Sequence, residues 1–201
     1  MTVKTRVAGV LLAAGEGSRL GRPKALVELG GVRLVDRGVA TLRDGGAAPV
    51  VAVTGAAVVD LLGVVIVHNP DWRSGMGSSL AVGLGSVPAS CDAAVVGLVD
   101  QPLIGPGSVR RLIAAYRAGA RVAVAAYYGQ PRNPVLLARE HWPAAIALAA
   151  GDVGARPFLR AHPELVTLVE CADTGRPDDV DTPEDLARIA AIVAAAEPTA
   201  S

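Results

Sequence analysis

The amino-acid sequence predicts a three-layer α/β protein in which helices cover both faces of a mainly parallel, mixed sheet. Apolar runs of strand length alternate along the chain with helix-like segments. These runs are continuously apolar, as expected for strands that are buried on both faces of a sheet. The 201 residues are 51% hydrophobic and 19% charged, which is a globular composition. We therefore expect a single domain over residues 1–201, with a core from about residue 6 to residue 196.

The first half of the chain begins with the apolar run Val7–Ala14, which leads into a glycine-rich loop that ends at Lys24. A serine near the start of a helix can cap its free N–H groups, so we expect Ser78 or Ser79 to begin a helix. The expected elements here are strands at Val7–Ala14, Val50–Thr54, Val64–His68 and Ala93–Leu98, and helices at Leu34–Arg43 and Ser78–Leu84.

In the second half, Gly119 is placed to end a helix, and Thr182 with Pro183 to begin the last one. The expected elements are helices at Val109–Ala118, Glu140–Ala149 and Pro183–Ala196, and strands at Val122–Tyr127, Pro134–Leu137 and Val166–Glu170. Ligands of such sheets bind beyond the carboxyl ends of the strands. The chemistry is therefore expected just after Ala14, just after Leu98 and in the later loops.

Charge, hydropathy and cysteine content exclude several classes of function. The 19 basic and 19 acidic residues give no net charge, which argues against a nucleic-acid partner. No apolar run approaches the roughly 20 residues that span a membrane, so we expect a cytoplasmic protein. Cys91 and Cys171 are far apart and have no zinc-site spacing, so both are expected to be buried thiols.

Glycines and cations are concentrated in the loop after the first strand, which reads LAAGEGSRLGRPK from Leu12 to Lys24. Its glycines allow sharp turns, and its exposed N–H groups can bind phosphate oxygens. Arg19 and Lys24 add positive charge where a polyphosphate would lie. The chain has 19 basic residues but only two lysines, Lys4 and Lys24. A compact ammonium suits one phosphate, so we predict a functional role for Lys24.

The same loop must be compared with a dinucleotide-binding turn. Gly15, Gly17 and Gly21 follow a first strand, but the expected third glycine position is occupied by Leu20. The residues after Pro23 do not have the pattern of the helix that such a turn requires. An NAD(P)-dependent oxidoreductase is therefore the second enzyme class that the sequence allows.

Carboxylates follow two of the predicted elements. Asp100 ends an apolar strand, and Pro102 prevents that strand from continuing, so its carboxylate can hold Mg²⁺ against nucleotide phosphates. Asp179 and Asp181 alternate around Val180 and can point to one face of an extended segment. Residues 75–80, which read GMGSSL, place flexible backbone before a helix N-terminus, where N–H groups and hydroxyls can bind a nucleotide.

Five segments together resemble the nucleotidyltransferases with a GT-A-like fold, and in particular their molybdenum cofactor cytidylyltransferase branch. The resemblance covers the chain in order from about Val7 to Leu186. Its segments are LAAGEGSRLGRPK, NPDWRSGMGSSL from Asn69, VDQPL from Val99, PRNPV from Pro131 joined with GDVGAR from Gly151, and DVDTPEDL from Asp179.

The resemblance implies residue roles. It favours Asp181 as the second Mg²⁺ ligand beside Asp100, with Asp179 in support, although the sequence leaves open which of Asp179 and Asp181 binds. Catalytic roles fall on Arg19, Lys24 and Asp100. The implied nucleotide-binding residues are Leu12, Ala13, Ala14, Gly15, Gly17, Ser18, Arg19, Lys24, Gly75, Met76, Ser78, Ser79 and Asp100, and the implied acceptor-binding residues are Gln101, Arg132, Asn133, Asp152 and Arg156.

The implied reaction is attack by an acceptor phosphate on the α-phosphorus of CTP, with release of pyrophosphate. The acceptor is a phosphorylated small molecule of the molybdopterin type, and a molybdoenzyme or its chaperone is an allowed protein partner. The branch usually reads Arg-Gly-His-Pro-Val where this chain has PRNPV. The resemblance therefore indicates nucleotidyl transfer more specifically than it indicates the acceptor. Ala14 favours a pyrimidine base, because the GTP-using relatives tend to have glycine there. GTP or another NTP with a different acceptor, and a non-catalytic cofactor-delivery protein, are the alternatives.

Overall fold

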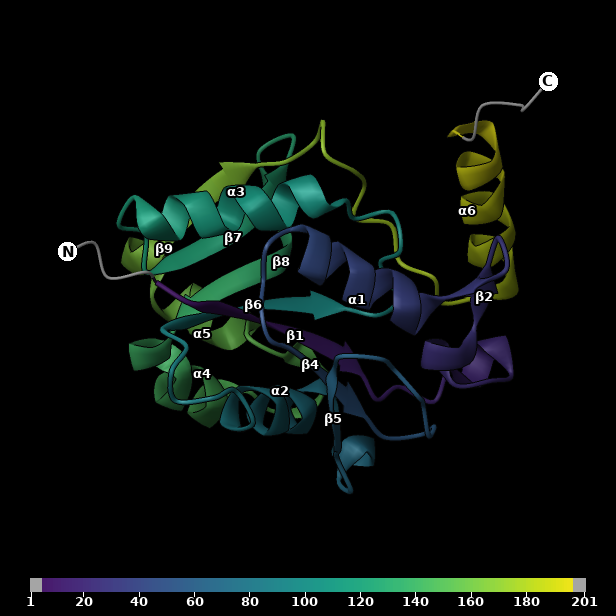
Figure 1. Cartoon of the computed structure of the whole chain (residues 1–201), viewed down its shortest axis with the longest axis horizontal. Helices are drawn as coiled ribbons and strands as arrows, with labels where there is room; N and C mark the ends of the chain where they lie inside the picture. The colour runs from purple at the N-terminus through teal and green to yellow at the C-terminus, as the bar shows by residue number, and fades with distance from the viewer. Residues whose placement is uncertain (1–4, 197–201) are drawn as a thin grey trace.

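A computed structural model describes residues 5–196 and contains a seven-stranded sheet in the order β5-β4-β1-β6-β8-β7-β9 (Figure 1). Strand β8 is antiparallel to both of its neighbours, and the other neighbouring pairs are parallel. The sheet is therefore mainly parallel and mixed, as predicted. A separate two-stranded hairpin, β2–β3, was not expected from the sequence.

The elements of the first half follow the expected order. Their bounds are β1 Val7–Ala13, β2 Glu28–Leu29, β3 Val32–Arg33, α1 Leu34–Asp44, β4 Val50–Thr54, β5 Val65–His68, α2 Met76–Gly85 and β6 Ala93–Leu98. Helix α2 begins two residues before the predicted start, directly after Gly75. The prediction that Ser78 or Ser79 caps it was wrong, because both lie inside the helix.

The elements of the second half are α3 Pro106–Arg117, β7 Val122–Tyr127, β8 Gln130–Ala138, α4 Trp142–Leu148, α5 Arg156–Ala161, β9 Val166–Glu170 and α6 Pro183–Ala196. Gly119 follows α3 with a φ of +114°, as a helix-ending glycine does. Thr182 and Asp185 cap the start of α6 by exchanging hydrogen bonds between side chain and backbone N–H. Strand β8 starts four residues before the predicted strand, because it forms a hairpin with β7.

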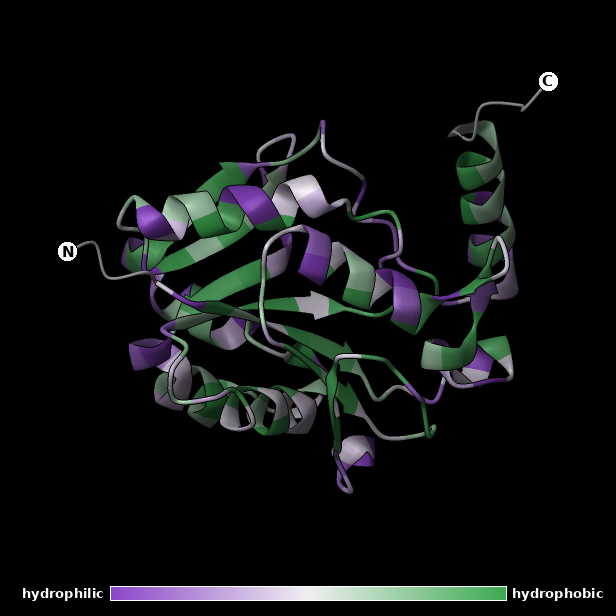
Figure 2. Ribbon diagram, viewed as in Figure 1, coloured by the Kyte–Doolittle hydropathy of each residue, from purple (hydrophilic) through white to green (hydrophobic). Residues whose placement is uncertain are grey.

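Helices α1 and α3 cover one face of the sheet, and α2, α4 and α5 cover the other (Figure 1). Two apolar clusters fill these interfaces. One contains Leu11, Leu34 and Leu112, and the other contains Val10, Leu80 and Phe158. Figure 2 shows the sheet in hydrophobic colours between helices of mixed polarity. Both cysteines are buried and form no disulfide, as predicted.

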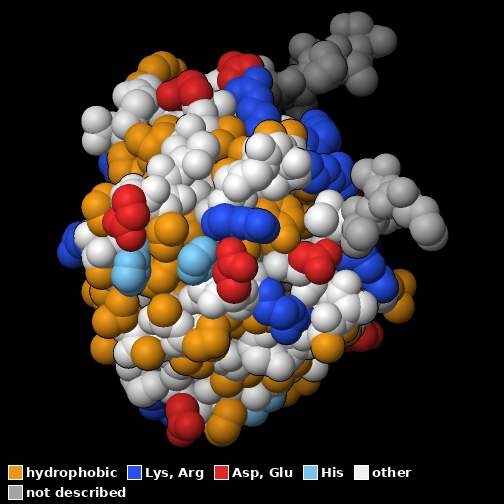
Figure 3. All heavy atoms as spheres, turned by 90° about the vertical axis from the view of Figure 1, so that its left-hand side faces the viewer, with side chains coloured by type: hydrophobic (Ala, Val, Ile, Leu, Met, Phe, Trp, Pro, Cys, Tyr) orange, Lys and Arg blue, Asp and Glu red, His pale blue; other side chains and the backbone are white. Residues whose placement is uncertain are grey.

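The carboxyl ends of β1 and β6 lie on the side of the molecule where α6 stands (Figure 1). The opposite side shows acidic and basic side chains interspersed, with no large area of one sign (Figure 3). No helix within residues 5–196 is long and apolar enough to cross a membrane. Because ligands of such sheets bind beyond the carboxyl ends of the strands, we expect the functional residues on the side where α6 stands.

Helix α2 offers a matched test of its packing. A Cβ at Gly83 would lie 2.5 Å from Val10 Cγ1 and 3.0 Å from Val53 Cγ2, whereas one at Gly85 would meet no described atom within 4 Å. We expect Gly83→Ala to lower the free energy of unfolding by about 1–3 kcal/mol through overpacking. Gly85→Ala should leave it equal or raise it by up to about 1 kcal/mol. Urea unfolding of both variants measures this, and equal effects would contradict the close packing of α2 on the sheet.

Candidate active site

The loop after β1 folds back on itself through glycines. Gly17 and Gly21 have φ values of +60° and +69°, and a Cβ on Gly17 would collide with the carbonyl oxygen of Arg22. The backbone N–H of Lys24 donates to the carbonyl oxygen of Gly15 at 3.2 Å. This hydrogen bond returns Lys24 to the end of β1, so the loop sequence sets the position of its only lysine.

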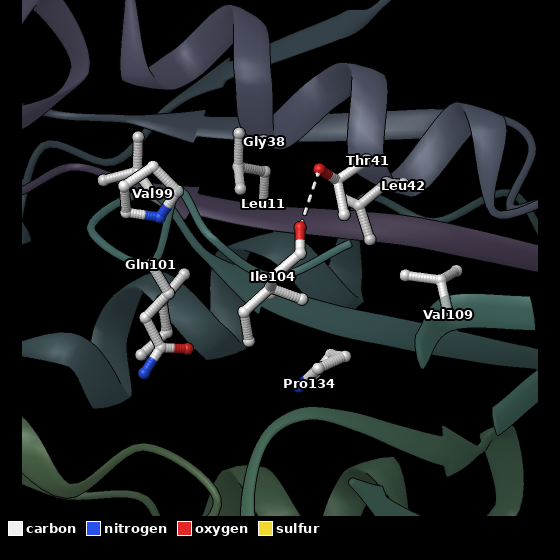
Figure 4. Close-up of a pocket in the computed structure, with 12 residues that line it drawn as sticks. Leu11, Gly38, Thr41, Leu42, Val99, Gln101, Ile104, Val109 and Pro134 are labelled. Carbon is white, nitrogen blue, oxygen red and sulfur yellow. Dashed lines mark hydrogen bonds between the residues drawn. The ribbon is translucent and has the colours of Figure 1, made fainter. Parts of the chain in front are cut away.

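Asp100 is held in a short loop after β6. The N–H of Val99 donates to Leu12 of β1 at 3.1 Å, and the N–H of Val180 donates to the carbonyl oxygen of Asp100 at 2.8 Å. Below this loop, the hydroxyl of Thr41 on α1 donates to the carbonyl oxygen of Ile104 at 3.2 Å, beside a cavity of about 20 Å³ (Figure 4). The hydrogen bond from Val180 to Asp100 brings residues 179–181 against the end of β6.

Lys24, Asp100 and Asp181, which we name the lysine–aspartate cluster, meet at this point. Lys24 Nζ lies 2.6 Å from Asp100 Oδ2 and 2.5 Å from Asp181 Oδ1. Arg19 Nη2 lies 3.3 Å from Asp181 Oδ2. The side chains of Lys24 and Asp100 are only 17% and 18% exposed, so their ion pair is shielded from solvent more than a surface pair.

The pKa shifts in the cluster follow from this geometry. Burial lowers the pKa of Lys24, but the two carboxylates outweigh burial, and the result is a pKa above its ordinary value. The hydrogen bond from Lys24 holds the pKa of Asp181 below its ordinary value, although partial burial opposes that shift. Lys24 is therefore cationic and Asp181 anionic at neutral pH.

Asp179 has a different partner from Asp181. Gln101 Nε2 donates to Asp179 Oδ1 at 2.8 Å. Burial raises the pKa of Asp179, the hydrogen bond from Gln101 opposes this shift, and the nearby carboxylates of Asp100 and Asp181 add to it. The two aspartates that alternate around Val180 thus belong to two neighbouring parts of the site, one at Lys24 and one at Gln101.

Two carboxylates of the cluster fit a divalent cation that substrate oxygens complete. Asp100 Oδ1 is buried and accepts no hydrogen bond from the described residues. Residues 5–196 contain no group of three or more His, Cys, Asp or Glu side chains arranged as a metal site. Mg²⁺ in nucleotide sites takes one or two carboxylates plus phosphate oxygens, which matches Asp100 and Asp181 and does not require a third protein ligand.

The start of α2 is occupied by contacts within the protein. Asn69 Nδ2 donates to Ser78 Oγ at 2.9 Å and to Ser79 Oγ at 3.0 Å. A Cβ at Gly75 or Gly77 would collide with the backbone of residues 149–151. The glycines of this segment therefore allow the loop before α5 to pack on α2, and the serine hydroxyls bond to Asn69.

A cavity of about 860 Å³ adjoins the cluster. Four predicted acceptor residues line it, namely Gln101, Arg132, Asn133 and Arg156. Asp152 is not part of this lining, and the described residues show no ion pair between Asp152 and Arg156. The predicted Leu12 and Met76 also line the cavity, and its aliphatic residues include Leu80, Val96, Leu98, Val124, Val135, Val166 and Leu168.

Sequence reasoning missed two features of this cavity. Arg160 lines it as well, one helical turn after Arg156 on α5, and that spacing of four residues was the available signal. The aliphatic lining includes Leu168, which is 50% exposed. The aliphatic residues come from α2 and from β6, β7, β8 and β9, and the sequence pattern does not show that these elements meet.

The remaining predicted nucleotide residues surround the end of β1. Ala13 and Ala14 are 2% and 7% exposed, and Ala14 Cβ lies close enough to Gly55 to leave no room for a Cβ there. Gly15, Gly17 and Ser18 belong to the loop that carries Arg19 and Lys24. All of these residues therefore lie at one edge of the sheet, next to Asp100.

The chain is similar to known proteins over most of its length. The family model described as "MobA-like NTP transferase domain" matches residues 9–166. Nicotine blue oxidoreductase of Paenarthrobacter nicotinovorans is 42% identical over 197 residues, which cover 91% of this chain and 96% of that protein. Molybdenum cofactor guanylyltransferase of Rhodobacter capsulatus is 32% identical over 194 residues, with coverage of 91% and 94%.

Solved structures share the fold. The crystal structure of Rv0371c from Mycobacterium tuberculosis in complex with manganese has a TM-score of 0.72 and 26% sequence identity, and covers 93% of this chain and 99% of that one. The structural neighbours include nucleotidyltransferases, and the predicted α/β, GT-A-like fold is confirmed.

The cluster predicts how stability depends on Lys24. Lys24→Met leaves two close carboxylates without their cation, so we expect a loss of about 2 kcal/mol in the free energy of unfolding at pH 7. In the native protein the pKa of Asp181 is lowered, so Asp181 stabilises the fold at every pH above its ordinary pKa of 3.8. Its contribution to the free energy of unfolding is therefore constant from pH 7 to pH 5. In the variant the two carboxylates repel each other, and uptake of a proton by the pair relieves the loss as the pH falls.

Urea unfolding at pH 7 and pH 5 measures this difference. Arg22→Met is the control, because Arg22 is exposed in the same loop and forms no ion pair with the described residues. A loss for Lys24→Met that is the same at both pH values would contradict the assigned ion pairs.

Proposed function

The chain belongs to the MobA-like NTP transferase family, and from that membership we propose that it transfers CMP from CTP to a phosphorylated acceptor of the molybdopterin type, releasing pyrophosphate. The observation that supports this proposal most is the meeting of Lys24, Arg19, Asp100 and Asp181 at the ends of β1 and β6. Two cations and two carboxylates there suit a triphosphate and a divalent cation.

The proposed mechanism is positioning and charge neutralisation. Lys24, Arg19 and the loop N–H groups bind the β- and γ-phosphates and stabilise the leaving pyrophosphate. Asp100 and Asp181 would hold Mg²⁺, which when bound neutralises phosphate charge. The protein aligns the acceptor phosphate with the α-phosphorus, and no general base is needed, because the acceptor oxygen is already anionic.

The acceptor is proposed to occupy the cavity of about 860 Å³, a size typical of small-molecule sites. Its aliphatic lining suits a flat ring system. Arg132, Arg156 and Arg160 form no ion pairs with residues 5–196, so their guanidinium groups are available for an anionic group of the acceptor. Gln101 and Asp179 connect this cavity to the cluster.

The choice of CTP rests on Ala14. Its methyl group is buried beside Gly55 and fills space at the end of β1 that a glycine would leave open. GTP is the alternative, and the 32% identical guanylyltransferase supports it.

A second candidate is an NAD(P)-dependent oxidoreductase, which the 42% identical nicotine blue oxidoreductase favours. The loop after β1 does not have the third glycine of a dinucleotide fingerprint, because Leu20 occupies that position. Reduced nicotinamide cofactor would have to bind beside the lysine–aspartate cluster, where its pyrophosphate would meet Lys24 and Arg19. The two candidates therefore share a phosphate site and differ in the need for a divalent cation.

Pyrophosphate release and thermal shift separate the candidates. We expect CTP with Mg²⁺ to raise the melting temperature more than CTP alone, and more than GTP, ATP or NADPH with Mg²⁺. Pyrophosphate should then form only when the phosphorylated acceptor is added. A metal-independent shift with NADPH, without pyrophosphate release from any NTP, would favour the oxidoreductase.

Asp100→Ala should remove metal-dependent CTP binding while the fold stays intact, because Asp100 lies in a loop at a strand end. Isothermal titration with Mg²⁺ and CTP measures the loss, expected to be about tenfold or more. Asp173→Ala is the control, since Asp173 is an exposed aspartate paired with Arg111. Native affinity in Asp100→Ala would remove Asp100 from the metal site.

Ala14→Gly should relax discrimination between the bases and admit GTP at modest loss for CTP. Exclusion by one methyl group is worth ~1–3 kcal/mol, so the ratio of kcat/KM values should change by ~10–200-fold at most. The ratio is measured for CTP and GTP in both proteins with one shared acceptor. An unchanged ratio would exclude Ala14 as the selector, and a native preference for GTP would overturn the cytidylyl assignment.

A further inference from the structure

The ammonium of Lys24 lies between the two carboxylates proposed to bind the metal. Its Nζ is 2.6 Å from Asp100 Oδ2 and 2.5 Å from Asp181 Oδ1. A divalent cation bonded to both of these oxygens, at about 2.0–2.6 Å, needs the same space. The two cations also repel each other, so they cannot both occupy this position.

Lys24 is held in this position by its surroundings. Its backbone N–H is bonded to Gly15, and its side chain is 17% exposed. Asp100 and Asp181 are the only side-chain partners of its ammonium among the described residues. A metal ion that displaced the ammonium would leave a largely buried charge without a partner, which is unfavourable.

Nucleotide phosphates change this balance. Lys24 lies in the glycine loop at the end of β1, where the triphosphate is proposed to bind. A phosphate oxygen gives the ammonium a new anionic partner and leaves both aspartates free for the metal. Binding of the two ligands is then coupled, and the coupling is reciprocal.

We propose that Lys24 makes metal binding depend on the nucleotide. Without nucleotide, its ammonium competes with divalent cations for Asp100 and Asp181, and the triphosphate relieves that competition. The inference rests on the proposed function of this site and concerns affinity, so a sufficiently high metal concentration still displaces the ammonium. Arg19 contributes less, because it contacts only Asp181, at 3.3 Å.

The test is titration with Mn²⁺, followed by the electron paramagnetic resonance signal of the free ion, with and without an α,β-methylene analogue of CTP. We expect the analogue to tighten Mn²⁺ binding to the native protein by about tenfold or more. Lys24→Met should bind Mn²⁺ without the analogue about tenfold more tightly than the native protein, and should gain several-fold less from the analogue, whose phosphate oxygens add ligands to the metal in both proteins. Arg22→Met, the control for charge in the same loop, should behave as the native protein.

Equal Mn²⁺ affinity of the native protein with and without the analogue would overturn the inference. So would a Lys24→Met affinity no greater than that of Arg22→Met. If Lys24→Met does not fold, Lys24→Gln replaces it, since glutamine keeps a hydrogen-bond donor without the charge. Pyrophosphate release from the same native preparation separates the two proposals. Turnover of CTP, with Mn²⁺ affinity that does not depend on the analogue, overturns this inference alone. Absence of both turnover and Mn²⁺ binding overturns both proposals.

Discussion

One ammonium shared by two carboxylates joins the parts of this site. Lys24 comes from the loop after β1, Asp100 from the end of β6, and Asp181 from the segment before α6. Asp100 and Asp181 would repel each other without the cation, and the backbone bond from Val180 to Asp100 keeps them close. The interaction therefore links the glycine loop, the end of β6 and the segment before α6 at one point.

Packing elsewhere in the molecule preserves that arrangement and shapes the cavity. Glycines at 75 and 77 allow the loop before α5 to approach α2 closely. Arg156 begins α5 directly after that loop and lines the cavity. A polar cluster thus lies next to a largely aliphatic cavity, and Gln101 contacts both through its hydrogen bond to Asp179. The cavity therefore combines aliphatic walls with the guanidinium groups of Arg132, Arg156 and Arg160.

Much of the fold follows from sequence pattern, because buried strands such as β4 and β7 are short apolar runs with clear ends. One of only two lysines in an arginine-rich chain, and an aspartate after an apolar strand, also indicated Lys24 and Asp100. Their meeting is a property of parallel strands, which end at the same edge. Other features depend on long-range contacts. The separate partners of Asp179 and Asp181 and the pairing of β8 with β6 are set by neighbours distant in sequence.

The family is established, and the substrates are proposals that depend on how the cluster responds to its ligands. The most direct test is a crystal structure with Mn²⁺ and a non-hydrolysable CTP analogue. We expect a cation bonded to Asp100 and Asp181 at about 2.0–2.3 Å, with Lys24 Nζ moved onto a phosphate oxygen. A structure in which Lys24 still bridges the two aspartates, with the nucleotide and cation bound elsewhere, would contradict this expectation.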